Sequence, residues 1–175
     1  MAGSILICDV AGNLVHRDVL MENGPSFIAR RSTDEPNREF IASRDNACRP
    51  VGLELGPDGS LYLLDMQRDV IEHPDYIPAR VKEKLNLRGG EDRGRIYRVA
   101  TDGFKPRPAP RLGKAATAEL VKVLEHGNGW HRDTAARLLY ERQDKAAVPE
   151  LEKLLRESSS GLGRMHALYV LDGLD

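Results

Sequence analysis

The stretch that decides the fold is Arg49–Asp65, which reads Arg-Pro-Val-Gly-Leu-Glu-Leu-Gly-Pro-Asp-Gly-Ser-Leu-Tyr-Leu-Leu-Asp. Two strand-like runs, Val51–Leu55 and Ser60–Asp65, flank the tetrapeptide Gly56-Pro57-Asp58-Gly59. Asp-Gly between apolar runs is a strong hairpin signal, because glycine adopts a positive φ without steric cost. The first run alternates apolar residues with Gly52 and Glu54, so one face of this strand is expected to be apolar.

A long polar excursion follows this hairpin, and strand-like sequence returns only at Arg95–Val99. We interpret the hairpin and the returning strand as part of a β-propeller blade that carries an insertion over residues 66–93. Within the insertion, Ala79–Leu87 is expected to form one or two helical turns, with Pro78 at the first position. Loops of this length are uncommon in compact domains and are often functional, so function is expected there.

Residues before the hairpin also read as short strands separated by turn residues. The strand candidates are Ser4–Cys8, Leu14–Met21, Ser26–Arg31 and Phe40–Ala42. Short strands at close spacing indicate all-β architecture. We therefore predict an antiparallel, propeller-like segment over residues 1–104.

The sequence pattern changes from strand-like to helix-like after residue 104. Residues 105–111 hold three prolines and predict a stiff linker. Beyond the linker, apolar residues recur about every 3.6 positions, which predicts helices at about 115–126, 129–142, 146–157 and 162–173. Leu120 and Leu151 are 31 positions apart, and Ala135 and Ala167 are 32 apart. Helix pairs at such a period indicate an α-solenoid, so residues 112–175 are predicted to form two HEAT-like pairs.

Composition limits the partners that can be expected. The hydrophobic fraction of 41% and the charged fraction of 30% fit a globular protein. A net charge of −1 gives no electrostatic reason to expect nucleic acid as a partner. No apolar run is long enough to span a bilayer, and the first residues lack the basic and apolar regions of a signal peptide.

The two cysteines, Cys8 and Cys48, allow two interpretations. Free cysteine is among the most buried residue types, so two buried thiols are the simpler expectation. A disulfide between neighbouring strands is the alternative and requires an oxidising compartment. No Cys-x-x-Cys-His haem attachment motif is present.

The insertion holds the densest set of potential ligands. Asp65, Asp69 and Glu72 are candidate metal ligands, and His73 is a candidate catalytic residue beside Asp75. Carboxylates and an imidazole could bind a divalent cation such as Ca²⁺, or serve as acid and base. The alternative is a solvated loop whose charges pair with nearby arginines, since no recognised ligand spacing is present.

Arg49 is the second candidate catalytic residue, at the start of the deciding stretch. Its guanidinium could clamp an anionic group, or it could form an ion pair with Asp45 or Asp65. Three other side chains are expected to be structural: His16 on a strand surface, Trp130 as an anchor of the helical core, and His166 on a mostly apolar helix.

Five segments, taken together, resemble one known arrangement: Ala11–Arg17, Arg49–Asp65, Ile71–Pro74, Asp92–Arg98 and Gly129–Ala135. In order and sequence they are similar to the large bacterial membrane-bound dehydrogenases, also described as PVC-type haem-binding proteins. The resemblance implies a propeller related to glucose/sorbosone dehydrogenases, then HEAT repeats, then a c-type cytochrome domain. It also implies a periplasmic or membrane-associated location. It places no catalytic base on a numbered residue of this chain.

The resemblance further implies that this chain is a fragment, because a closed propeller takes about four to eight blades and the chain holds about two. Its expected partners are the remaining blades and further HEAT repeats, and open sheet edges could also form a homo-oligomer. The quinone-type cofactor and the c-type haem are expected elsewhere in the full protein, with none bound within this segment.

The leading functional expectation is therefore a segment of a quinoprotein-type sugar or alcohol dehydrogenase that is not active alone. The alternative is a non-catalytic module that binds a protein or polysaccharide through the concave face of the solenoid and the 66–93 loop. A gene fragment without any activity of its own is a third possibility.

Overall fold

The computed structural model describes residues 3–175, and the chain divides into two compact units. The first unit runs up to Glu54 and resumes over Leu61–Val99, and the second comprises Leu55–Ser60 and Ala100–Asp175. The predicted β-rich segment began at residue 1, and its first two residues lie outside the described part of the chain. The hairpin turn of the deciding stretch thus belongs with the helices, although the strands on either side of it belong to the first unit.

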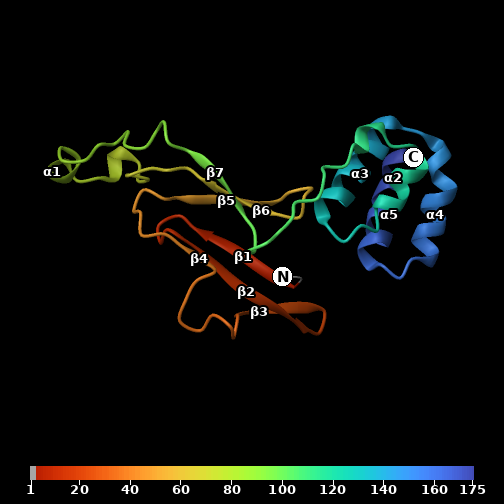
Figure 1. Cartoon of the computed structure of the whole chain (residues 1–175), viewed down its shortest axis with the longest axis horizontal. Coiled ribbons are helices and arrows are strands. Elements are labelled where there is room, and N and C mark those ends of the chain that lie inside the picture. The colour runs from red at the N-terminus through yellow and green to blue at the C-terminus, as the bar shows by residue number, and fades with distance from the viewer. Residues whose placement is uncertain (1–2) are drawn as a thin grey trace. The chain divides into compact units, whose positions relative to one another are not determined.

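The first unit contains an antiparallel sheet built around one long strand (Figure 1). Its strands are β1 (Ser4–Asp9), β2 (Leu14–Asn23), β3 (Ser26–Arg31) and β4 (Ile41–Ala42). On one side of β2 lies β1, with Cys8 opposite Val15. On the other side β3 pairs with residues 18–23 and β4 with residues 14–15. Residues 16 and 17 of β2 therefore face the loop that joins β3 to β4.

A second antiparallel sheet has the order β5-β6-β7 and contains the predicted hairpin. Its strands are β5 (Pro50–Leu55), β6 (Leu61–Asp65) and β7 (Arg95–Val99). The backbone N–H of Gly56 donates to the carbonyl of Ser60 at 2.8 Å, and Gly59 has a φ of +87°. The Asp-Gly hairpin is therefore confirmed, and antiparallel sheets form where the sequence predicted strands.

The excursion between β6 and β7 contains little regular structure. It holds a 3₁₀ turn, η1 (Pro74–Tyr76), and one short helix, α1 (Ala79–Lys82), which is shorter than predicted. Figure 1 shows α1 at the far end of this excursion from the sheet. The ladder between β6 and β7 starts at Asp65 opposite Arg95, so the two ends of the excursion meet at this pair.

The second sheet buries the alternate residues of β6 rather than those of β5. Leu61, Leu63 and Asp65 are buried, whereas Val51 and Leu55 are 46% and 49% exposed. The predicted apolar face of the first strand therefore exists, but within the described residues it is only partly covered.

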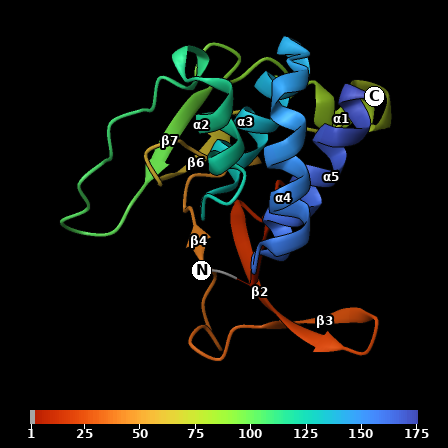
Figure 2. The ribbon, with the colours of Figure 1, turned by 90° about the vertical axis from the view of Figure 1, so that its right-hand side faces the viewer.

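The second unit is helical, with η2 (Leu112–Lys114), α2 (Thr117–Val123), α3 (Gly129–Arg142), η3 (Lys145–Ala147), α4 (Val148–Glu157) and α5 (Gly161–Leu174). Figure 2 shows α4 and α5 side by side. One apolar core joins all four α-helices, and its most buried side chains are Leu120, Leu124, Leu139, Leu151 and Leu174. The four predicted helices are confirmed, whereas the assignment of the sheets to partial propeller blades and of the helices to a HEAT solenoid remains a prediction.

Side-chain caps explain where two of these helices begin. The Asn128 side chain accepts a hydrogen bond from the Trp130 backbone N–H at 2.9 Å, and Ser160 accepts from Gly163 at 3.0 Å. Such caps satisfy backbone donors that the first turn of a helix leaves free. In the described part of the chain, no helix combines the length and apolar character that crossing a bilayer requires.

Candidate functional site

Asp65, the last residue of β6, is the most buried of the predicted site residues, at 3% exposed. Its Oδ1 accepts hydrogen bonds from the backbone N–H groups of Arg49, at 2.7 Å, and Gln67, at 2.9 Å. The second bond helps to hold Gln67 in a left-handed conformation, with φ at +51°. The chain therefore turns out of the strand at a buried carboxylate.

The guanidinium group of Arg49 donates to three backbone carbonyls, which belong to two segments of the chain. Its Nε donates to the Arg68 carbonyl at 2.9 Å, its Nη1 to Val10 at 3.1 Å and its Nη2 to Asp69 at 3.2 Å. The contact with Asp65 comes from the backbone N–H of Arg49, so the expected ion pair is replaced by a backbone hydrogen bond. The positive charge of Arg49 is thus directed at peptide oxygens around the Asp65 turn.

Gln67 is the second buried polar residue at this turn, at 4% exposed. Its side-chain Nε2 donates to Oδ2 of Asp45 at 3.1 Å. The other oxygen of Asp45 accepts from the Ala47 backbone N–H at 2.9 Å. The Ala47 bond first and the Gln67 bond second hold the pKa of Asp45 below its usual value. Asp45, Asp65 and Gln67 therefore form one hydrogen-bonded cluster.

Both cysteines are free thiols. Cys48 is buried beside this cluster, and Cys8 on β1 is half-buried. Burial raises the pKa of each thiol. For Cys48 a hydrogen bond with Ser43 opposes this effect, whereas the charge of Asp65, a hydrogen bond with the Asp65 side chain and the charge of Asp45 raise the pKa further. The expectation of buried thiols therefore holds fully for Cys48 and partly for Cys8, and the alternative disulfide is not formed.

The remaining predicted site residues lie on the exposed part of the excursion. The backbone N–H of Asp69 donates to Gly89 at 3.1 Å, and Glu72 accepts from the Ile71 N–H at 3.3 Å. His73 caps η1 by accepting from the Asp75 N–H at 3.4 Å. These three side chains do not join Asp65.

The predicted metal ligands Asp65, Asp69 and Glu72 are not gathered into one group in the described part of the chain. Across residues 3–175, no three side chains of histidine, cysteine, aspartate or glutamate gather where they could hold a metal ion. The metal-binding role of Asp65, Asp69 and Glu72 and the catalytic roles of His73 and Arg49 stay predictions.

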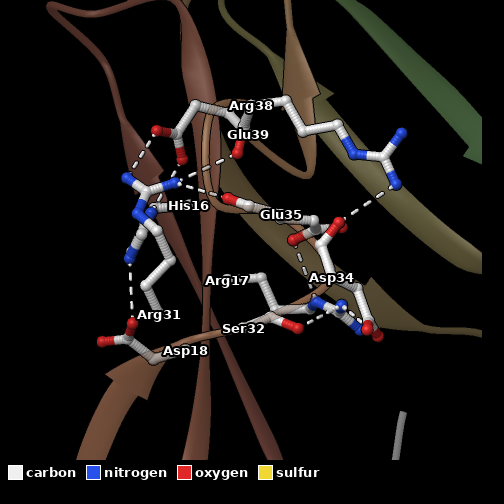
Figure 3. A network of polar contacts seen from close by, with 9 residues as sticks. All are labelled: His16, Arg17, Asp18, Arg31, Ser32, Asp34, Glu35, Arg38 and Glu39. Atoms are coloured by element: carbon white, nitrogen blue, oxygen red, sulfur yellow. Dashed lines mark hydrogen bonds and ion pairs between the residues drawn. The ribbon is translucent and has the colours of Figure 1, made fainter.

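A polar network that the sequence did not predict holds the loop between β3 and β4 (Figure 3). His16 on β2 lies between two carboxylates, with Nδ1 2.7 Å from Glu39 and Nε2 2.9 Å from Asp18. Arg31, at the end of β3, donates to the second oxygen of Glu39 at 2.7 Å. The bond with Glu39 first and that with Asp18 second raise the pKa of His16.

The same loop is also held through Arg17, the next residue of β2. Arg17 donates to Glu35 at 3.1 Å and to the Ser32 hydroxyl at 2.7 Å. Successive residues of a strand point to opposite faces of a sheet. His16 and Arg17 therefore hold the loop from both faces, at the position where β2 has no strand partner on that side. Because both ring nitrogens of His16 face carboxylates, the imidazole is placed as an ion-pair partner rather than as a base.

A third cluster, in the second unit, joins the turn of the deciding stretch to α3. Asn128 donates from Nδ2 to the Gly56 carbonyl at 2.8 Å, and His131 donates from Nε2 to the Pro57 carbonyl at 3.0 Å. The His131 ring also stacks on His126, with centroids 4.0 Å apart. Trp130 is half-buried against the helical core, as predicted for a core anchor. The Gly-Asn-Gly-Trp-His sequence indicates the start of a helix. Nothing in that sequence indicates the contact with residues 56–57.

Comparison with known proteins places the N-terminal part of the chain in a family. Residues 1–103 match the family described as a domain of unknown function (DUF7133), and the chain belongs to that family. No curated protein and no solved structure gives a significant match.

Proposed function

We propose that this member of the DUF7133 family is an assembly segment of a larger propeller-and-repeat protein of the quinoprotein sugar or alcohol dehydrogenase type. In this proposal the two sheets pack against further blades, and the helices continue into further repeats. The chain supplies structure and is not active alone. Catalysis and cofactor binding belong to the complete assembly, which the resemblance would place in the periplasm or at a membrane.

The observation that carries the proposal is the apolar surface that both sheets leave open. Phe27 on β3 is 64% exposed and Ile96 on β7 is 68% exposed. Further large apolar side chains on the strands are also exposed, namely Ile5, Ile7, Val19, Met21, Ile28, Val51, Leu55 and Tyr97. Scattered apolar residues are normal on a surface, but sets of this size on strands mark sites of further packing.

The outer strands of both sheets support the same proposal. In the described residues β1 and β3 are outermost in one sheet, and β5 and β7 in the other. Strands at such positions present backbone donors and acceptors that can pair with another strand. Blades of a propeller, or a second copy of this chain, would cover these edges.

The last helix shows the corresponding feature in the helical unit. Leu168 on α5 is 54% exposed, and Leu162, Met165 and Tyr169 are exposed as well. Leu168 follows Ala136 of α3 by 32 positions, and Ala136 packs against the core that α3 shares with α5. By this repeat, a third helix pair would pack on α5 as the second pair packs on α3.

Enzyme assay and dye binding together test the proposal. The purified chain, supplied with pyrroloquinoline quinone and Ca²⁺, is expected to give no reduction of an acceptor dye with glucose or ethanol. It is expected to bind an apolar fluorescent dye, and Phe27→Lys combined with Ile96→Lys should lower that signal. Ser26→Lys with Glu54→Lys adds charge at polar strand positions and is the control. Turnover by the chain alone, or dye binding equal in all three proteins, would contradict the proposal.

A second function, binding of a protein segment by the helices, is favoured by a groove between α2 and α4. The groove has a volume of about 560 Å³, which is within the usual range for ligand sites. Lys122 and Lys153 line it together with Glu125, Glu150 and Glu157. Mixed charge suits a peptide with both kinds of charged side chain.

A peptide array probed with the chain tests this second function. Signals that depend on the groove should fall in Lys122→Glu combined with Lys153→Glu and persist in Arg137→Glu, a change on the exposed face of α3. Signals that the groove variant leaves unchanged would rule out this binding role.

A further inference from the structure

The proline-rich linker and the residues after it carry a strip of positive charge that the composition of the whole chain conceals. Residues 103–118 hold four cationic side chains and no aspartate or glutamate, although the chain as a whole has a net charge of −1. All four side chains are exposed, namely Lys105, Arg107, Arg111 and Lys114. Residues 105–114 are called the basic strip below.

The cations of the basic strip have no carboxylate partner within the chain, in contrast with several other exposed cations. Arg88, Arg137 and Arg156 each pair with a glutamate three or four positions away, at 2.6, 2.7 and 3.1 Å. Within residues 3–175, no ion pair and no side-chain hydrogen bond holds any of the four cations of the basic strip. Their charge can therefore be matched by a partner without breaking an existing contact.

Proline holds the first part of the basic strip in an extended form. From Lys105 to Pro110 every residue is either a proline or the residue before one. The ring fixes the φ of proline at about −65°, and the residue before a proline is driven out of the helical region. The structure accordingly has neither helix nor strand there (Figure 2). A partner meets a segment that is already extended, so binding has few backbone angles left to order.

The helical unit holds the other end of the basic strip. Leu112 is buried in the helical core, and the Arg142 guanidinium donates to the carbonyls of Ala115, at 2.7 Å, and Gly113, at 3.1 Å. At the rise of about 3.1 Å per residue of a polyproline-type chain, Lys105 and Arg111 lie about 19 Å apart. The basic strip is thus a short extended segment that projects from a packed base.

Backbone chemistry of the basic strip favours a polypeptide as the partner. Residues 105–110 have six carbonyl groups but only three N–H groups, because three of them are prolines. None of these groups makes a backbone hydrogen bond within the described residues. A polypeptide brings N–H donors for such carbonyls, whereas the phosphate oxygens of a nucleic acid or a lipid only accept. Guanidinium groups bind carboxylates through two parallel N–H bonds, so aspartate and glutamate supply the matching charge.

Nucleic acids and membranes fit the basic strip less well. Residues 105–118 contain no aromatic side chain, and proteins that bind single-stranded nucleic acid stack bases on aromatic rings. Segments that lie on a membrane add apolar side chains that enter the bilayer. The one large apolar side chain of the basic strip, Leu112, is buried in the helical core instead.

We propose that the basic strip binds an acidic polypeptide segment, whose aspartate or glutamate side chains pair with Lys105, Arg107 and Arg111. None of these residues lines the groove between α2 and α4, so this is a separate binding site. Binding at the basic strip does not depend on the proposed assembly.

Fluorescence anisotropy of a labelled oligoglutamate peptide, titrated with the full chain, tests the proposal. The parent is expected to bind the peptide saturably at low salt, with an affinity that falls as added salt screens the charges. Lys105→Glu combined with Arg107→Glu and Arg111→Glu should weaken binding by about tenfold or more. All three positions are exposed, so this variant should fold, which circular dichroism checks.

A matched control reverses the same number of charges elsewhere. Arg80→Glu combined with Lys84→Glu and Arg137→Glu changes three exposed cations outside the basic strip and should bind like the parent.

The prolines allow the extended form to be tested apart from the charge. Pro106→Ala combined with Pro108→Ala and Pro110→Ala keeps every cation and returns freedom to the backbone. Because more backbone angles must then be ordered on binding, the affinity for oligoglutamate should fall by about threefold or more.

Four results would overturn the proposal. The first is a parent chain that gives no saturable binding of oligoglutamate at low salt, which needs no variant to interpret. The second is equal binding by the parent and the charge-reversed strip, or an equal loss in the control. The third is tighter binding of labelled duplex DNA or of phosphatidylglycerol vesicles than of oligoglutamate, which would make the partner a phosphate-bearing one. The fourth is parent-like binding by the proline variant, which would contradict the role of the extended backbone.

Discussion

The backbone N–H of Arg49 donates a 2.7 Å hydrogen bond to Oδ1 of Asp65, which joins the first and last residues of the stretch that decides the fold. The turn of a hairpin normally fixes how its two strands pair. In this hairpin a hydrogen bond also links the two chain ends that lie opposite the turn. The closing group is a buried carboxylate rather than another strand residue. The same carboxylate starts the turn into the long excursion, so strand pairing and loop exit depend on one side chain.

Replacing Asp65 by alanine should therefore destabilise the first unit. Two backbone N–H groups lose their acceptor, and each such loss costs about 1–3 kcal/mol when the donor stays buried. Asp69→Ala, at an exposed position, should change the free energy of unfolding by less than about 0.5 kcal/mol. Urea unfolding in EDTA measures both, and equal stability of the two variants would refute this role for Asp65.

Gly90 should be the glycine of the excursion that is hardest to replace. Its φ is +84°, and a Cβ there would lie 2.4 Å from the carbonyl oxygen of Gln67, a backbone atom that cannot turn aside. Gly90→Ala should cost more than the roughly 1–2 kcal/mol of the left-handed conformation alone. Gly103 has a similar φ of +74° with nothing within 4 Å, so Gly103→Ala isolates the conformational part. Thermal unfolding should show the larger loss for Gly90→Ala.

The network around His16 should make stability depend on pH. Glu39 and Asp18 raise the pKa of His16 above its ordinary 6.5, so the folded state favours the imidazolium. This stabilisation is complete below pH 6.5 and is lost as the pH rises through the raised value. Bonds from Arg31 first and His16 second lower the pKa of Glu39 below its ordinary 4.5, so its contribution is lost in acid. The network is therefore strongest between these two ordinary values.

Urea unfolding at about pH 6 and about pH 9 checks this expectation. The parent should be more stable at the lower pH, and His16→Gln should lose that part of the difference. His73→Gln is the control, because His73 lies on the exposed excursion and should leave the difference intact. A difference that survives in His16→Gln would show that another group titrates.

Asn128 has two roles that substitutions can separate. Its Oδ1 caps α3 and its Nδ2 binds the Gly56 carbonyl. Asn128→Ser keeps a cap and loses the turn contact, whereas Asn128→Ala loses both. A lost cap costs about 0.5–2 kcal/mol, and a lost hydrogen bond about 0.5–1.5 kcal/mol. In thermal unfolding the parent should have the highest melting temperature, the serine variant a lower one and the alanine variant the lowest. A serine variant as stable as the parent would show that the contact with the turn does not contribute to stability.

Strands, the Asp-Gly hairpin and the four α-helices could be predicted because their signals are local. Apolar period, turn residues and cap residues lie within a few positions of the structure they specify. The helix predicted over residues 79–87 stops at Lys82, since a short amphipathic run needs a packing partner and α1 buries none of its residues.

The candidate site was predicted only in part, because its members meet across long separations. Asp65 was found from the density of carboxylates, but Gln67 and Asp45 carry no local signal of their pairing. His16 and Glu39 are 23 positions apart and meet only because β3 and β4 pair with the same strand. Asp69 and Glu72 are predicted as metal ligands because they lie close to Asp65 in the sequence. The fold does not bring their side chains together with that of Asp65.

Sedimentation velocity of the parent chain against Phe27→Lys combined with Ile96→Lys tests the assembly proposal most directly. The chain has a mass of 19.5 kDa, and exposed apolar strand faces should drive it into larger species as its concentration rises. The double variant should shift towards the monomer, and Ser26→Lys with Glu54→Lys should behave like the parent. A parent that sediments as a 19.5 kDa monomer at every concentration would contradict the account.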